Sequence, residues 1–361
     1  AKLLNAPVVL IVNVTKSTRT IAAVVHGCRS FDPKLRIEGV ILNRVAGERH
    51  KNVITEAIEK YTGIPVLGAL PKLPSDMLIP GRHLGLVTPQ EHVLLEESLN
   101  NAADAVNQYV DIDRLREIAQ NAGELEFNGK ELYIIVANGE GLKIGIFKDS
   151  AFTFYYPENL ESLESTGAEL VEISSLEDTA LPDIDALYIG GGFPETHIEK
   201  LSGNRGLMAS VKSAAESGLP VYAECGGLIY LSKALIIDNR EIEMSGVLPV
   251  DVKMHNRPRG HGYSEMIVDE SNPFLKEGIS VRGHEFHYTG IENKFGECKT
   301  AFSILKGEGC FDKRDGLIYK NVMASYSHIH ALGFSEWVEG IIKAAALYRM
   351  SKKNEMNAIA V

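Results

Sequence analysis

Apolar runs alternate with amphipathic segments along the first 70 residues. Three short runs rich in Val, Ile and Leu, at 7–12, 37–42 and 66–69, have the length and composition of buried strands. Between them, residues 18–28 and 51–61 carry apolar side chains at helical spacing. Strand, helix, strand, helix, strand at this spacing predicts a parallel sheet with crossover helices, and hence an α/β fold.

A change of composition predicts where the first domain ends. Residues 73–92 are rich in Pro, Gly and polar side chains and are predicted to form a long loop. Helical periodicity returns at 94–109 and 112–122. The following polar, glycine-containing stretch is the predicted boundary. The predicted organisation is therefore a first domain at 1–120, a linker at 121–130 and a second domain at 131–361.

The second domain begins a new α/β pattern. The predicted strands are 133–136, 143–147, 171–173, 186–189 and 221–223, and the predicted helices are 159–166 and 207–217. Beyond residue 223 the pattern is less regular. A strand at 281–288, a strand-like segment at 322–328 and a final helix at 336–350 are predicted there.

The segment VYAECGGL at 221–228 predicts a nucleophile. A short apolar strand is followed by Cys225, by two glycines and by a predicted helix at 228–235. The glycines give a tight strand-to-helix turn the backbone room that it needs. The helix N-terminus lowers a thiol pKa and stabilises a developing oxyanion. We therefore expect Cys225 to present its thiol at the turn, and the alternative is a buried structural cysteine.

A cysteine nucleophile needs a base, and histidines occur in three groups downstream. These are His255 and His261, His284 and His287, and His328 and His330. The last group ends an apolar stretch, VMASYSHIH, and a base far along the chain can meet the thiol in space. His330 lies two residues further on a strand-like path, points the same way as His328, and is a candidate to orient it. The alternative is a purely structural histidine.

Three consecutive glycines follow the predicted strand at 186–189, in the segment YIGGGFPE. A backbone without Cβ atoms can approach a ligand closely and turn its N–H groups inward, as in a main-chain oxyanion hole. Such a glycine run can instead bind phosphate. Because GGGFPE has neither GxGxxG spacing nor a GK[ST] ending, a nucleotide role at this position is weakly supported.

Composition limits the classes of function. The chain has 361 residues, enough for two domains, and 45% of them are hydrophobic. A net charge of −11 argues against a nucleic-acid partner, although an anionic small substrate needs only a local basic pocket. Four scattered cysteines without a CxxC pair predict neither a disulfide framework nor a metal site. With no apolar run long enough for a membrane span and no signal peptide, we expect a cytoplasmic protein.

The motifs GGGFPE, AECGGL and SYSHIH, in this order, resemble those of class I glutamine amidotransferases. The resemblance is to the cobyric acid synthase-like branch, in which the residue two positions after the histidine is not the usual glutamate. AFTFYYPENLESL, RGHEFHY, GVILNRV and RHLGLV extend the resemblance to the cobyrinate a,c-diamide synthases over nearly the whole chain. The fold that it implies is a partial P-loop-NTPase-like, dethiobiotin synthetase-like parallel-sheet domain followed by a class I glutamine amidotransferase domain.

The resemblance also implies a glutamine-hydrolysing amidoligase of cobalamin biosynthesis. In such an enzyme Cys225 attacks the glutamine amide, His328 is the base, and N–H groups of Gly192 and Gly226 form the oxyanion hole. ATP with Mg²⁺ activates the a and c acetate carboxylates of cobyrinate, which ammonia then converts to amides. Nickel sirohydrochlorin, amidated on the way to coenzyme F430, is the alternative substrate.

This sequence contains no GxxxxGK[ST] phosphate-binding loop, which synthetases of this family carry. We therefore expect the synthetase half to be incomplete, either in a truncated chain or in a glutaminase and docking subunit that needs a separate ATP-binding chain. A homodimer is a further expectation. Candidate contacts to the substrate carboxylates are Arg82, His83, Arg257 and Arg259.

Overall fold

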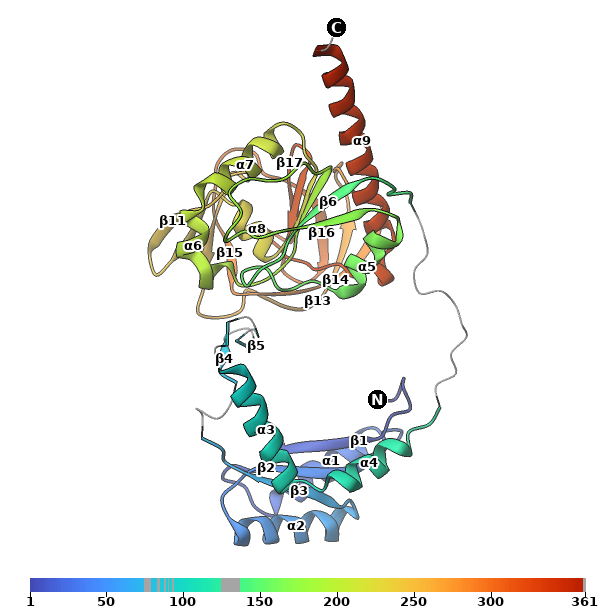
Figure 1. Ribbon diagram of the computed structural model, residues 1–361. Helices are drawn as coiled ribbons and strands as arrows, with labels where there is room; N and C mark the ends of the chain where they lie inside the picture. Colours follow the sequence, from blue (N-terminus) through green and yellow to red (C-terminus); the bar gives the residue numbers. More distant parts are fainter. Residues whose placement is uncertain are drawn as a thin grey trace. The chain divides into compact units, whose positions relative to one another are not determined.

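Two units, Ala1–Lys130 and Glu131–Val361, make up the chain (Figure 1). The structure is a computed structural model and describes residues 1–74, 79–82, 85–87, 89, 91–92, 94–124 and 137–359. The strand predicted at 133–136 and the predicted contact His83 lie outside these residues. The model contains no helix that is both long and apolar enough to cross a membrane, within the residues described.

A three-stranded parallel sheet is the centre of the first unit, as predicted. Its order is β1 (Val8–Asn13), β2 (Ile37–Val45) and β3 (Val66–Pro71), with crossover helices α1 (Thr20–Phe31) and α2 (Glu48–Thr62). Successive side chains of β2 point to opposite faces: Val40 and Leu42 pack with the crossover helices, whereas Ile41 packs on the other side with Val110 and Ile118. The helices α3 (Leu95–Tyr109) and α4 (Ile112–Gln120) follow, after two short paired strands, β4 (Gly81–Arg82) and β5 (Gly85–Leu86).

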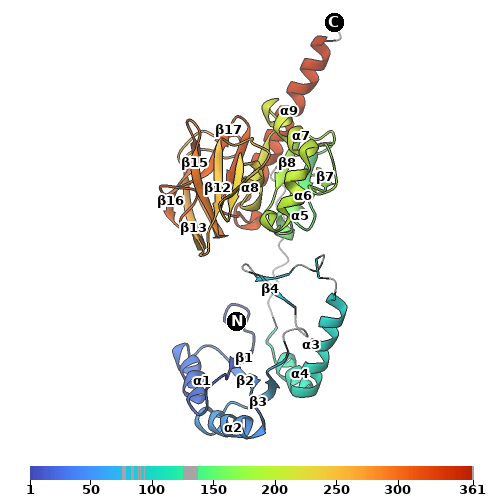
Figure 2. The same cartoon turned by 90° about the vertical axis from the view of Figure 1, so that its left-hand side faces the viewer.

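A nine-stranded mixed sheet runs through the second unit (Figure 2). One end is parallel and consists of β7 (Glu169–Ile173), β6 (Lys143–Phe147), β8 (Ala186–Ile189), β9 (Val221–Glu224) and β18 (Val322–Ser325). The other end is antiparallel and continues through β17 (Arg314–Tyr319), β16 (Lys299–Lys306), β13 (Gly260–Val268) and β14 (Ser280–His287). The boundary between the two ends lies at β18, next to the strand that leads to Cys225.

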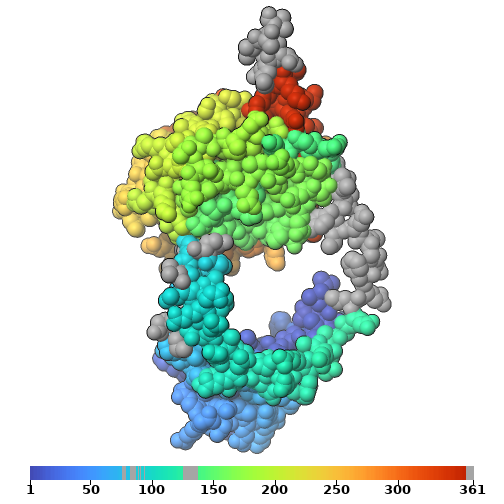
Figure 3. Space-filling view, viewed as in Figure 1, coloured from blue at the N-terminus to red at the C-terminus, as the bar shows by residue number. Residues whose placement is uncertain are grey.

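Helices cover both faces of the parallel end. They are α5 (Pro157–Ser165), η2 (Pro194–His197), α6 (Ile198–Gly203), α7 (Arg205–Glu216), α8 (Gly226–Leu231), η3 (Ala331–Gly333) and α9 (Glu336–Ile359). Ile189 packs with α7 and α8 in one apolar cluster, whereas its neighbour Tyr188 packs on the opposite face against Trp337 of α9. The helix α9 runs past the edge of the second unit (Figure 3).

A second, smaller sheet shows where the sequence-based prediction was wrong. It has the order β11 (Arg240–Glu243), β10 (Ala234–Ile237), β12 (Val250–Met254) and β15 (Thr289–Lys294). The helix predicted at 228–235 instead ends at Leu231, because the chain from Ala234 pairs with both β11 and β12. Tertiary pairing, together with the β-branched Ile236 and Ile237, outweighs the helical pattern there.

Candidate active site

Cys225 lies on a strained turn between β9 and α8. Its backbone has φ 46° and ψ −93°, which a residue with a Cβ rarely adopts. The two glycines after it fit close to neighbouring backbone, tightly at Gly226 and with no room for a Cβ at Gly227. A Cβ on Gly226 would lie 3.0 Å from the amide nitrogen of Gly192, and one on Gly227 would lie 2.5 Å from the carbonyl oxygen of Ile189. This strand, strained residue and helix form a nucleophile elbow.

The Cys225 side chain is more enclosed than the sequence suggested. We expected a thiol that stands clear of the sheet, but the residue is only 7% exposed and belongs to an apolar cluster that includes Leu228 and Tyr326. The turn projects the side chain toward the end of β18, whose following segment covers it. The sulfur is nevertheless near the imidazole of His328, because it is one of the groups that raise the pKa of that ring.

His328 reaches Cys225 because the two strands before them are parallel neighbours. β9 and β18 pair in register, so the chain segments that leave them emerge at the same edge of the sheet. The Cys225 amide donates to the carbonyl of Ser325 at 2.7 Å. The backbone of His328 pairs with that of His284 on β14 through two hydrogen bonds of 2.7 and 3.0 Å. The backbone of His328 is therefore fixed by His284, and that of Ser325, three residues earlier, is fixed by Cys225.

Glu224 is the carboxylate behind the imidazole, and the sequence analysis did not identify it. Its Oε2 lies 3.1 Å from Nδ1 of His328, and its side chain is 1% exposed. Tyr188 donates a hydrogen bond to Oε2, and the amide of Ile329 donates to Oε1, both at 3.2 Å. The signal in the sequence was a charged residue inside the apolar run VYAEC, because a buried carboxylate needs such partners.

The environment of His328 favours its protonated form. Burial by itself lowers the pKa of an imidazole, but the hydrogen bonds to Cys225 and Glu224 and the negative charges of those groups outweigh it. The result is a pKa for His328 raised from 6.5 to about 10. His328 is thus an imidazole that holds its proton between a carboxylate and a sulfur atom.

His330 does not occupy the position expected of an orienting residue. Nδ1 of His328 is engaged by Glu224 instead. The ring of His330 lies 4.7 Å from that of Tyr156, and its Nε2 is 3.5 Å from Oε2 of Glu158. The strand-like path assumed from the sequence ends at Ser325, so the two imidazoles point to different partners.

The glycine run lies against the imidazole. A Cβ on Gly191 would be 2.7 Å from Cε1 of His328, and one on Gly192 would be 2.1 Å from the carbonyl oxygen of Ala151. Within the described residues, no acceptor is bonded to the amide of Gly192 or to that of Gly226. Two backbone N–H groups near the thiol are thus available to donate hydrogen bonds to an oxygen that becomes negatively charged during a reaction.

The predicted substrate contacts lie elsewhere. Arg257 and Arg259 are exposed on the segment between β12 and β13, and Arg82 belongs to β4 of the first unit. Nε of Arg259 would lie 3.6 Å from a Cβ on Gly290, which places it over β15. Neither Arg257 nor Arg259 has a hydrogen bond or ion pair to Cys225 or His328 among the residues described in the second unit.

The segment that follows β1 in the first unit does not fit a nucleotide phosphate. The segment after β1, VTKSTR at 14–19, has no glycine to let the backbone wrap around an anion. The side chain of Asn13 instead accepts the amide of Thr15 at 3.0 Å. The described part of the chain also contains no group of three His, Cys, Asp or Glu residues able to hold a metal ion.

Comparison with known proteins places this chain in a family. The model of the CobB/CobQ-like glutamine amidotransferase domain matches residues 143–335, and that of an AAA domain matches residues 1–77. A protein of Archaeoglobus fulgidus is 42% identical over 96% of this chain and 74% of its own length. A protein of Listeria innocua is 42% identical over 91% of this chain and 72% of its own length. A protein of Methanosarcina acetivorans is 38% identical over 98% of this chain and 75% of its own length. All three are named cobyrinate a,c-diamide synthase, and the chain belongs to this family of amidotransferase ligases.

Proposed function

We propose that this chain takes ammonia from glutamine at Cys225 and that the ammonia amidates the a and c acetate carboxylates of cobyrinate. The observation that carries the glutaminase half is the buried hydrogen bond between Glu224 and His328, with Cys225 near that imidazole and two amides available beside it. The relatives' common name supports cobyrinate as the substrate.

The first step is attack by Sγ of Cys225 on the side-chain amide carbon of glutamine. Because Glu224 engages Nδ1 of His328, Nε2 is the nitrogen left for the thiol proton. The carbonyl oxygen becomes negatively charged as the sulfur–carbon bond forms. The amides of Gly192 and Gly226 donate hydrogen bonds to this oxygen, which lowers the barrier.

The second step releases ammonia. His328, now protonated, gives its proton to the departing nitrogen, and the tetrahedral intermediate collapses to a γ-glutamyl thioester. Water then attacks the thioester with His328 as base, which yields glutamate and restores the thiol. Glu224 keeps the imidazole in the correct orientation throughout, and its charge stabilises the imidazolium.

Ammonia forms an amide only if the receiving carboxylate is activated. ATP supplies this activation by phosphorylating the carboxylate. Because the segment after β1 does not fit a phosphate, we derive no step of this half-reaction from it. The basic side chains Arg82, His83, Arg257 and Arg259 are our candidates for binding the carboxylates of the macrocycle.

Incubation of the chain with glutamine, ATP, Mg²⁺ and cobyrinate tests the proposal. Mass spectrometry of the macrocycle reports amidation, and glutamate release reports the glutaminase. Two amides on cobyrinate are expected. Amidation of nickel sirohydrochlorin in preference to cobyrinate would overturn the substrate assignment. The chain would instead be a glutaminase subunit if it released glutamate without amidating the macrocycle and if a separate ATP-binding chain restored the amidation.

A further inference from the structure

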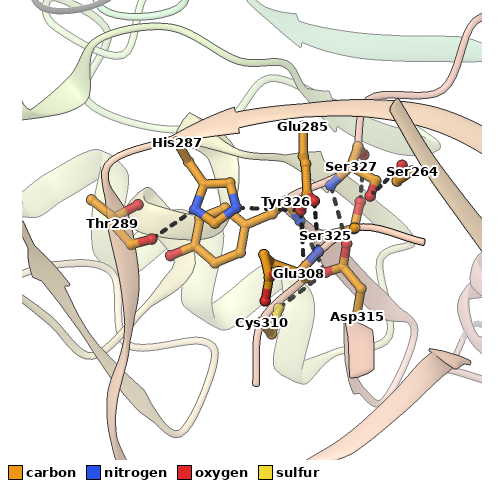
Figure 4. Close-up of polar contacts among 12 residues, drawn as sticks. Ser264, Glu285, His287, Thr289, Glu308, Cys310, Asp315, Ser325, Tyr326 and Ser327 are labelled. Atoms are coloured by element: carbon orange, nitrogen blue, oxygen red, sulfur yellow. Dashed lines mark hydrogen bonds and ion pairs between the residues drawn. The ribbon is translucent and has the colours of Figure 1, made fainter. Parts of the chain in front are cut away.

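A buried network surrounds Asp315 on β17, beyond the residues that would react with glutamine (Figure 4). The Asp315 side chain is 0% exposed and accepts four hydrogen bonds. Oδ1 accepts from Sγ of Cys310 and the amide of Tyr326, both at 3.0 Å, and from the amide of Gly316 at 2.8 Å. Oδ2 accepts from the amide of Ser327 at 3.1 Å. A buried carboxylate with both oxygens satisfied fixes its donors in space.

Two of these donors directly precede His328 in the chain. Tyr326 and Ser327 have left the ladder of β18, so their amides have no strand partner and bond to Asp315 instead. The next residues are held by other groups: His284 pairs with the backbone of His328, and Glu224 accepts the amide of Ile329. Asp315 therefore supplies two backbone anchors just before the imidazole. The hydroxyl of Ser325 also donates to the carbonyl of Ser327, and that of Ser264 to the Ser327 hydroxyl.

The same network holds the side chain of Tyr326. Its ring stacks on that of His287, with centroids 3.8 Å apart and planes at 9°. Nδ1 of His287 is 2.7 Å from the carbonyl of Thr289, and its Nε2 is 3.5 Å from Oε2 of Glu285. Burial above all raises the pKa of the Tyr326 phenol well above its usual value.

Cys310 contributes as a hydrogen-bond donor. Burial first, and then the charge of Asp315, raise the pKa of this thiol well above its usual range. The thiol is therefore protonated at neutral pH and donates to Oδ1. It is distinct from Cys225, whose partner is an imidazole.

We propose that Asp315 is a positioning residue of the glutaminase site, which holds the backbone of Tyr326 and Ser327 so that His328 faces Cys225. This inference rests on the proposed function. Asp315 touches neither glutamine nor the reacting atoms, and it acts through the two amides. The charge matters as well as the shape, because the carboxylate accepts at both oxygens. An asparagine with its oxygen in the Oδ1 position would place an NH₂ group against the Ser327 amide, donor against donor.

The variant Asp315→Asn tests this, with Asp185→Asn as the matched control. Asp185 is also buried, at 8% exposure, and accepts a hydrogen bond from the amide of Lys143 at 2.9 Å. It directly precedes β8, at the amino ends of the parallel strands, whereas Cys225 follows the carboxyl end of β9. For both variants we would measure kcat and KM for glutamine, the melting temperature, and the pH profile of iodoacetamide labelling at Cys225 by peptide mapping.

We expect Asp315→Asn to lower kcat at least about 10-fold with KM within about 2-fold, as for loss of an interaction made mainly in the transition state. The labelling profile of Cys225 should shift, since the thiolate depends on the position of His328. Asp185→Asn should lower the melting temperature but leave kcat and the labelling profile of Cys225 unchanged. Equal kcat losses in the two variants, or a wild-type labelling profile in Asp315→Asn, would overturn the proposal.

Two further results keep the test decisive. If Asp315→Asn does not fold, Cys310→Ala removes one donor only and should give a smaller kcat loss with the same sign. An unchanged kcat in that folded variant would then overturn the positioning role. If the wild-type chain releases no glutamate, the proposed function fails, whereas the labelling profile still reports whether Asp315 positions His328.

Discussion

Glu224 and His328 form a buried hydrogen bond, with Oε2 of the carboxylate 3.1 Å from Nδ1 of the imidazole. The two residues come from adjacent parallel strands, and Glu224 directly precedes the cysteine whose partner it orients. On an extended strand successive side chains alternate, so Glu224 and Cys225 leave the backbone in different directions. The strained turn at Cys225 returns its sulfur to the same imidazole.

Replacing Glu224 by Gln is expected to slow glutamine hydrolysis roughly 10²–10⁴-fold, as for loss of the carboxylate in other catalytic triads. The amide keeps the size of the side chain but loses the charge that stabilises the imidazolium. The measurement is kcat for glutamate release. Glu158→Gln, which alters only the partner of His330, is the control and should retain activity. A Glu224→Gln variant as active as that control would remove Glu224 from the account.

The two histidines of SYSHIH should differ sharply. We expect His328→Ala to reduce kcat roughly 10²–10⁴-fold, the usual range for a lost general acid and base. His330→Ala should change it little, because that ring contacts Tyr156 and Glu158. Steady-state glutamate release by both variants provides the comparison. Equal losses would mean that the contact between Cys225 and His328 is not the catalytic one, and His284 would be examined next.

Gly192 tests the proposed oxyanion hole. A methyl group there would press on the carbonyl of Ala151 and displace the amide that faces the reaction, so Gly192→Ala should lower kcat about 10²–10³-fold. Gly203→Ala is the matched control, because a Cβ at Gly203 meets nothing within 4 Å. A folded Gly192→Ala variant with the kcat of Gly203→Ala would exclude this amide from catalysis.

The raised pKa of His328 predicts a pH-dependent stability. The native state binds the imidazole proton more tightly than the unfolded chain, so this stabilisation is fully present below pH 6.5 and is lost as pH rises through about 10. The difference in free energy of unfolding between wild type and His328→Gln should therefore shrink over that window. Urea denaturation at several pH values measures it. A difference that grows with pH would mean that the native state favours the neutral ring.

Much of the fold was predictable because its elements are local. The apolar runs of β2 and β8 and the amphipathic pattern of α2 mark these elements without tertiary information. The strands from β10 to β17 were mostly missed. They combine half-buried polar residues with short turns, and their pairing partners are distant in sequence.

The candidate site was predictable only where the backbone conformation requires particular residue types that the sequence displays. The strained turn at Cys225 requires glycines, and these are visible in the sequence. The role of Glu224 was not predicted, because it depends on the pairing of β9 with β18 and not on spacing. His330 was chosen by assuming a longer strand than the chain forms. The enclosure of Cys225 likewise results from segments that are far away in sequence.

The most direct test of the central claim is to trap the thioester. The wild-type chain is incubated with glutamine, quenched in acid, digested and analysed by mass spectrometry, with Cys28→Ser and Cys225→Ser alongside. The account predicts a γ-glutamyl adduct on the peptide that carries Cys225 in the wild type and in Cys28→Ser, and no adduct in Cys225→Ser. Glutamate release by Cys225→Ser at the wild-type rate, or an adduct on a different residue, would contradict it.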